Sequence, residues 1–258
     1  MTDTRITLVT GANQGVGLQL TKELVAHGHT VYLGSRDLAR GERAAADIAE
    51  VEIARGGSAI PIQLDVTDAD SIAAAAARIR AEQGRLDLLV NNAGISKTVD
   101  RVLGSPEYRA HSLASNASLD EIRAVWDVNV FGALAVYQAM LPLLRDGGDA
   151  RVVMVSSGVG SLATNADPSY AYHSIYGPGY AASKTAMNAM ALTMMIELEN
   201  TDIKVNIVSP AFTATALNGF AGTESVEDGS REVVRVALLG PDGPSGTFTQ
   251  WENTAIPW

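Results

Sequence analysis

The chain has 258 residues, a formal net charge of −10 at neutral pH and no cysteine. Its length suits one large buried core, and the absence of cysteine excludes disulfides, thiolate catalysis and cysteine-ligated metals. The acidic balance opposes binding to nucleic acid or to an anionic membrane. No apolar run reaches membrane-spanning length, the four histidines lack a metal-ligand spacing, and a first strand near Arg5 leaves no room for a signal peptide. A cytoplasmic protein without a metal is therefore expected.

The first element in chain order is a strand that leads directly into a glycine turn and a helix. Residues 5–10 form a short apolar, β-branched run, and a helical pattern through Leu24 and Val25 follows the turn. Glycines let a backbone approach a pyrophosphate, whose charge is held by unpaired N–H groups at the helix N-terminus. The spacing Gly-x-x-x-Gly-x-Gly also fits a plain glycine-rich loop, but the position at the first strand-to-helix junction favours dinucleotide binding. The predicted contact residues are Gly11, Asn13, Gln14, Gly15, Val16 and Gly17.

Strand-like and helix-like segments alternate through the rest of the chain. Later strands are expected at residues 30–33, 58–64, 86–90, 151–155, 203–208 and 246–249, with helical stretches between them. This alternation implies parallel crossovers, and no linker or repeat divides the sequence. We therefore predict an α/β fold with a Rossmann-type, doubly wound parallel β-sheet flanked by helices, in a single domain over residues 1–258.

A tyrosine and a lysine four residues apart are the most informative pair in the chain. Tyr180 and Lys184 follow Pro178, which suits a first helical position, and the i, i+4 spacing places both side chains on one helix face. A nearby cation and a helix N-terminus stabilise a phenolate, so we expect the pKa of Tyr180 to fall from its ordinary value near ~10. The same spacing occurs by accident on exposed helices, so the pair gains weight only beside the glycine turn.

Together, the glycine turn and the Tyr-x-x-x-Lys pair resemble the short-chain dehydrogenase/reductase family, in particular its NADPH-dependent carbonyl reductases. The resemblance extends over almost the whole chain and implies a catalytic tetrad of Asn129, Ser157, Tyr180 and Lys184. It implies that Ser157 holds the substrate carbonyl oxygen while Tyr180 protonates the developing alkoxide. Lys184 would bind the nicotinamide ribose and lower the tyrosine pKa, and Asn129 would anchor a water that passes protons toward the lysine. Taken alone, Asn129 could also be a polar residue that kinks a helix, and Ser156-Ser157 could be an ordinary turn.

Further cofactor contacts follow from the same resemblance. Asp65 would lie beside the adenine ring, although a turn or N-cap aspartate fits the sequence equally. The run Asn91 to Gly94 would steady the central sheet and line the cleft, and the loop after Pro210 would cover the nicotinamide. The implied contacts in these segments are Asp65, Val66, Asn92, Ala93, Gly94, Pro210, Thr213 and Thr215.

The end of the second strand favours NADP over NAD. NAD-binding chains usually place a carboxylate there for the ribose 2′-hydroxyl, whereas this chain has Ser35 followed by Arg36. Serine removes the repulsion toward a 2′-phosphate and arginine can pair with it, with help from Asn13. Alternatively, Arg36 is a surface residue paired with Asp37.

Two departures from the family pattern lie near the expected substrate site. Ala211 stands where the family usually has glycine, so the backbone must avoid positive φ or accept strain. The separation between Ser157 and Tyr180 is longer than usual, which defines an inserted segment at about residues 162–178. Its aromatic side chains could line the substrate pocket or pack on one another. They are Tyr170, Tyr172, His173 and Tyr176.

The predicted substrate contacts are Ser157, Tyr176, Phe212 and Leu217, the last two from a substrate loop at about residues 211–228 that could also be ordinary lid packing. The expected function is NADPH-dependent reduction of a ketone or aldehyde. An alcohol dehydrogenase of the same family and a dinucleotide-responsive regulatory protein are the alternatives. Methionines along the Tyr180 helix more often belong to a core than to an interface. A homodimer or homotetramer is nevertheless the expected assembly.

Overall fold

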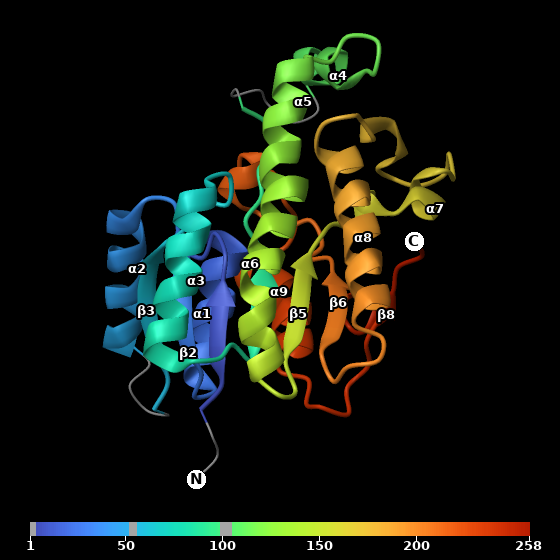
Figure 1. Cartoon of the computed structure of the whole chain (residues 1–258). Helices are drawn as coiled ribbons and strands as arrows, with labels where there is room; N and C mark the ends of the chain where they lie inside the picture. The colour runs from blue at the N-terminus through green and yellow to red at the C-terminus, as the bar shows by residue number, and fades with distance from the viewer. Residues whose placement is uncertain (1–3, 52–55, 99–104) are drawn as a thin grey trace.

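The computed structural model describes residues 4–51, 56–98 and 105–258, and within them eight strands form one sheet in the order β3-β2-β1-β4-β5-β6-β7-β8. Strands β1 to β7 pair in parallel, and β8 runs antiparallel to β7 (Figure 1). The strands are β1 (Ile6–Val9), β2 (Thr30–Ser35), β3 (Ser58–Gln63), β4 (Leu88–Asn91), β5 (Arg151–Val155), β6 (Lys204–Val208), β7 (Phe248–Gln250) and β8 (Thr254–Ala255). The predicted doubly wound parallel sheet is confirmed, and the short antiparallel β8 is an addition to it.

Helices cover both faces of the sheet because successive strand residues point to opposite sides. Val152 and Met154 of β5 belong to one buried cluster, with α3 (Ala69–Gln83), α6 (Ala133–Asp146) and α8 (Tyr180–Glu197). Val153 and Val155 belong to the other, with α1 (Gly15–Ala26), α2 (Leu38–Val51) and α9 (Val226–Ala237). The near-continuous apolar runs of the strands are thus explained by burial on two sides.

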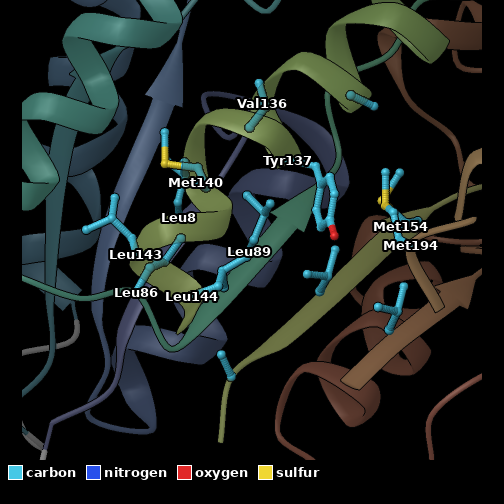
Figure 2. Close-up of a cluster of buried hydrophobic side chains, with 14 of the residues drawn as sticks. Leu8, Leu86, Leu89, Val136, Tyr137, Met140, Leu143, Leu144, Met154 and Met194 are labelled. Carbon is cyan, nitrogen blue, oxygen red and sulfur yellow. The ribbon is translucent and has the colours of Figure 1, made fainter. Parts of the chain in front are cut away.

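Helix α6 supplies a large part of the first cluster (Figure 2). Its buried side chains, among them Tyr137 and Met140, pack against Leu8 and Leu89 of the sheet. Met187 and Met194 of α8 are also fully buried, with 1% of each exposed. The interpretation of the α8 methionines as core residues is therefore confirmed for these two.

In the part of the chain that the structure describes, one continuous helical run, Leu119–Asp146, is apolar and long enough to cross a membrane. The expectation that no run reaches this length is therefore wrong by length and composition. The run comprises α5 (Leu119–Trp126), a π-helical turn η2 (Asp127–Gly132) and α6, and half of its most apolar window is buried in the fold. A core helix passes the same test, so the run is weak evidence for a membrane span.

The remaining short elements lie beyond the carboxyl ends of the parallel strands. In Figure 1, α4 (Pro106–Ser112) stands above the upper ends of β5 and β6. The other short elements are η3 (Gly158–Gly160), α7 (Leu162–Asn165), η4 (His173–Ile175) and η5 (Ala216–Asn218). In a doubly wound sheet this end carries the ligand site, so these segments frame the candidate site.

Helix α8 begins at Tyr180 and not, as expected, at Pro178. Its N-cap is Gly179, whose ψ of −100° is not helical, so the helix cannot start earlier. The carbonyl of Pro178 instead accepts a hydrogen bond of 3.0 Å from Trp126 Nε1. Tyr180 therefore occupies the first helical position, at the edge of the site.

Candidate active site

A cavity of about 740 Å³ opens at the carboxyl ends of the strands. This volume is in the range of small-molecule sites. Nearly all of the predicted site residues line it, although they come from segments far apart in the chain. They are Gly11, Asn13, Gln14, Gly15, Val16, Gly17, Ser35, Arg36, Asp65, Val66, Asn92, Ala93, Gly94, Ser157, Tyr180, Lys184, Pro210, Phe212, Thr213, Thr215 and Leu217.

The glycine turn is shaped for close backbone approach. Gly11 and Gly15 have φ values of 62° and 58°, in the left-handed region that favours glycine. A Cβ on Gly17 would collide with Asn92 Nδ2, so the third glycine allows the turn to pack against the loop after β4. Gln14, the N-cap of α1, makes no side-chain cap bond, which leaves the first N–H groups of the helix available to an anion.

At the end of β2, two arginines line the cavity and only one of them is paired with Asp37. Arg40 makes the ion pair with Asp37, at 3.5 Å. The hydroxyl of Ser35 donates a hydrogen bond of 2.7 Å to the backbone carbonyl of Asp37. The structure therefore does not show the alternative, an ion pair between Arg36 and Asp37. Arg40, which lies in the first turns of α2, was missed by the sequence analysis.

Asp65 is both a turn aspartate and a cavity residue. Its Oδ1 accepts hydrogen bonds from the backbone N–H and the hydroxyl of Thr67, at 2.9 and 2.7 Å. These two bonds, and to a smaller extent the charge of Arg36, lower the pKa of Asp65. The carboxylate is therefore held ionised at the rim of the cleft.

The two consecutive serines after β5 have different surroundings. Ser156 is buried and donates a 2.6 Å hydrogen bond to Asn188 Oδ1, which makes it a structural residue. Both serines line the cavity, and the Ser157 hydroxyl interacts with the Tyr180 phenol, an interaction that by itself favours a lower pKa of that phenol. Of the pair, Ser157 is therefore the residue available to a ligand.

The pKa of Tyr180 moves opposite to the expectation. Burial raises it to about 12, and Tyr108 adds to the rise, while the hydrogen bond with Ser157 opposes it. The Lys184 ammonium lies 5.9 Å from the centroid of the tyrosine ring and is directed elsewhere, so burial outweighs its attraction for a phenolate. The expected lowering is wrong for this structure, in which the phenol keeps its proton at neutral pH.

Lys184 is almost completely buried and donates a 2.8 Å hydrogen bond to the Val155 carbonyl. Burial lowers its pKa to about 8. A Cβ on Gly94 would lie 3.5 Å from Lys184 Nζ and 3.2 Å from Asn129 Oδ1, so the lysine and the asparagine converge beside this glycine. The absence of a side chain at Gly94 keeps the space next to the ammonium open.

Asn129 lies behind the cavity wall, in the π-helical turn η2. Its amide nitrogen donates 2.9 Å hydrogen bonds to the Ile95 carbonyl and to Ser183 Oγ, and its oxygen accepts from the Ile95 N–H at 2.9 Å. The side chain thus holds the loop after β4 against the helix that carries Lys184. The irregular helix expected at Asn129 is present as well, and such turns often occur at functional sites.

Phe212 and two tyrosines form the wall of the cavity beyond Ser157. Tyr170 and Tyr172 line it, as does Leu217 of the substrate loop. Tyr176 does not line the cavity: its hydroxyl lies 3.1 Å from Thr185 Oγ1 on α8. The prediction of Tyr176 as a substrate contact is therefore wrong, because the chain turns its ring onto the helix.

Tyr108 and His111 of α4 also line the cavity and were missed by the sequence analysis. Ser105 caps this helix and Pro106 opens it, so the helix start was readable from the sequence. Its position over the site was not readable, because it depends on contacts with segments distant in the chain.

Ala211 adopts φ of 56° and therefore accepts the strain that glycine would avoid. A left-handed backbone at a residue with a Cβ destabilises the folded state by about 1–2 kcal/mol. Glycine avoids this strain, but its greater freedom in the unfolded chain lowers the stability by about 0.4–1 kcal/mol. We expect Ala211→Gly to raise the free energy of unfolding by about 0.5–1 kcal/mol. Urea denaturation measures this, and Ala214→Gly, in the same loop but without positive φ, should lower it. If both substitutions lowered the free energy of unfolding equally, Ala211 would not be strained.

The geometry defines a class of protein before any comparison: a doubly wound α/β oxidoreductase, with a dinucleotide turn at the first crossover and a hydroxyl, a phenol and an ammonium at the strand ends. The family model for short chain dehydrogenase matches residues 5–225. The chain belongs to this family. It is thus an oxidoreductase that acts on CH–OH or C=O groups with a nicotinamide dinucleotide.

Similar proteins span its full length. A short-chain dehydrogenase of Penicillium roqueforti, anuI, is 33% identical, over 97% of this chain and 96% of its own. The structure of salutaridine reductase from Papaver somniferum has a TM-score of 0.77 at 26% identity, covering 95% of this chain and 99% of that one. NADPH-bound carbonyl reductase from chicken fatty liver has a TM-score of 0.79 at 25% identity and covers 99% of both chains.

In the part of the chain that the structure describes, no three His, Asp or Glu residues gather as a metal site.

Proposed function

We propose that the protein is an NADPH-dependent carbonyl reductase that transfers hydride to a ketone or aldehyde and forms an alcohol. The observation that carries the proposal is the placement of Ser157 beside the Tyr180 phenol and Lys184 in one cavity at the strand ends. In the reductive direction the carbonyl oxygen must gain a proton, and the phenol is a proton donor within reach of the Ser157 side of the cavity. The structural likeness to an NADPH-bound carbonyl reductase supports the same direction.

The residues of the cleft fit a dinucleotide. The left-handed turn at Gly11 and Gly15 and the open N-terminus of α1 suit a pyrophosphate. Arg36 and Arg40, with Asn13, would hold a 2′-phosphate, and Asp65 would face the adenine end. When bound, NADPH supplies the hydride.

In the proposed reaction each side chain acts on the substrate oxygen or on its neighbours. Ser157 would donate a hydrogen bond to the carbonyl oxygen, and Tyr180 would transfer its proton to that oxygen as the carbon receives hydride. Lys184 would bind the nicotinamide ribose and replace the phenol proton. Asn129 would keep the lysine in place through its bonds to Ile95 and Ser183. The aromatic wall would exclude water.

The proposal is tested by NADPH oxidation with a panel of ketones, aldehydes and quinones, run beside NADH and beside alcohol oxidation with NADP⁺. Turnover in the reductive direction supports it. Faster alcohol oxidation would favour the dehydrogenase alternative, and tight NADPH binding without turnover on any compound would favour the regulatory one.

Arg36 should determine the cofactor preference. Because a charge-assisted hydrogen bond contributes about 1.5–3 kcal/mol, Arg36→Ala should weaken NADPH binding by about 10- to 100-fold and leave NADH within about twofold. Fluorescence titration of both cofactors measures this. Arg43→Ala is the matched control, since Arg43 is exposed on α2 and is outside the cavity lining. An equal loss for NADH and NADPH would contradict the assignment.

Assembly and location stay predictions. Leu192 and Ile196 are exposed on α8, at 46% and 60%, which supports the expected homodimer or homotetramer. The net charge of −10 supports a protein that avoids nucleic acid and anionic membrane surfaces, and the cytoplasm stays its expected location.

A further inference from the structure

We infer that the substrate is a ketone that carries an aromatic ring with a polar group on it, because three aromatic side chains beside Ser157 form a wall that begins at a free phenol. This inference rests on the proposed carbonyl reductase function and names the class of carbonyl compound that the site takes.

The wall is a continuous series of rings. Tyr170 and Tyr172 meet edge to face with their centroids 5.6 Å apart, and Tyr172 meets Phe212 at 5.8 Å with a tilt of 53°. Tyr170 and Tyr172 belong to the segment 162–178, whereas Phe212 belongs to the loop after β6. The wall therefore joins the two segments that enclose the substrate end of the cavity. Aromatic faces and edges attract a flat unsaturated ring more than a saturated ring of equal size.

The wall begins next to the reacting oxygen. A Cβ on Gly158, the residue after Ser157, would lie 3.4 Å from the hydroxyl oxygen of Tyr170. Glycine at this position leaves room between the Tyr170 phenol and the site of the carbonyl. Within the described residues the Tyr170 hydroxyl makes no hydrogen bond, whereas the hydroxyl of Tyr176 in the same segment lies within hydrogen-bond distance of Thr185. The free phenol can thus pair with an oxygen or nitrogen carried by the substrate ring.

Helices α4 and α5 also contribute to the lining of the cavity. Tyr108 lines the cavity and is close enough to Tyr180 to raise its pKa. Ile122 and Val125 continue this lining with apolar surface. A Cβ on Gly177 would lie only 2.6 Å from the Ser112 carbonyl, so α4 and the segment 162–178 touch at the mouth. In Figure 1, α4 accordingly lies above this segment at the same end of the sheet. The substrate end of the cavity is therefore enclosed by aromatic and apolar side chains, which suit a ring.

The test compares binding of β-tetralone and β-decalone, which share one carbon skeleton, to the NADP⁺-loaded protein by calorimetry. The first has a benzene ring and the second is saturated. A merely apolar pocket would favour the decalone, whose hydrocarbon surface is larger. We expect the tetralone to bind about 3- to 10-fold more tightly, and a ring hydroxyl to improve its binding further compared with a ring methyl.

Variants separate the two parts of the wall. Tyr172→Leu and Phe212→Leu should each move the tetralone-to-decalone ratio toward one. Tyr170→Phe should keep that ratio and abolish the preference for the hydroxylated ring. Tyr176→Phe, a phenol outside the cavity, should change neither and is the matched control. Unchanged NADP⁺ affinity in each variant verifies that it is folded.

A wild-type ratio at or below one would overturn the inference, whatever the turnover. Failure of the proposed function gives a different result: selective tetralone binding without NADPH oxidation on any carbonyl compound. That outcome would support the aromatic subsite and reject the reductase.

Discussion

Tyr180→Phe should lower kcat/KM for carbonyl reduction by about 10²–10⁴ and leave NADPH affinity within about twofold of wild type. The change removes the one proton that the mechanism delivers to the substrate oxygen, while the ring continues to fill its place at the start of α8. Steady-state kinetics with NADPH, together with a binding titration of the cofactor, measures the two quantities separately.

Tyr176→Phe provides the control for this experiment, since it also removes a phenol hydroxyl but does so outside the cavity. It should retain wild-type kcat/KM within about twofold. If Tyr180→Phe reduced NADPH affinity as strongly as turnover, its role would be structural. If it had no effect, the proton donor would have to be another group.

Acid should destabilise the protein through His29, which is 5% exposed with its Nδ1 at 2.9 Å from Thr7 Oγ1. Burial, then the charges of Arg5 and His27, lower its pKa from 6.5 to about 4. Above pH 6.5 the imidazole is neutral in both the folded and the unfolded chain. Between pH 6.5 and 4 the unfolded chain binds a proton that the folded chain does not bind, so stability falls as the pH falls. The expected loss over this window is about 3 kcal/mol.

Urea denaturation at a series of pH values between 7 and 5 tests this, because Asp65 and Glu232, whose pKa values are lowered, titrate mainly below that range. His29→Asn is the comparison: its amide can still bond to the Thr7 hydroxyl but does not titrate. The slope of unfolding free energy against pH should be smaller in this variant. Identical slopes in both proteins would exclude His29 as the cause.

Local patterns in the sequence were sufficient for the fold and for most of the cleft. Strand residues alternate between two buried faces, and the alternation of strands with helices leaves few topologies. The carboxyl ends of parallel strands meet at one edge, so the glycine turn, Asn92, Ser157 and Pro210 had to lie together once the strands were identified. These features depend on short-range periodicity, which a single chain displays directly.

The chemistry of individual side chains was decided by the tertiary structure. The pKa of Tyr180 depends on burial and on its neighbours Ser157 and Tyr108, none of which the spacing of Tyr180 and Lys184 reveals. Tyr176 turns onto α8, whereas Tyr170 and Tyr172 enter the cavity, although all three occupy one short segment of irregular backbone. No periodicity assigns a face in such a segment.

The sequence by itself therefore determined the parallel sheet and the dinucleotide turn, because each follows from spacing along the chain, and its family resemblance supplied most of the residues of the site. Only the tertiary structure decided which arginine is paired, which tyrosines face the cavity, and how far each pKa moves. The physical reason is that burial, charge and hydrogen-bond partners are set by segments distant in sequence, such as Tyr108 near Tyr180 and Asn188 bonded to Ser156.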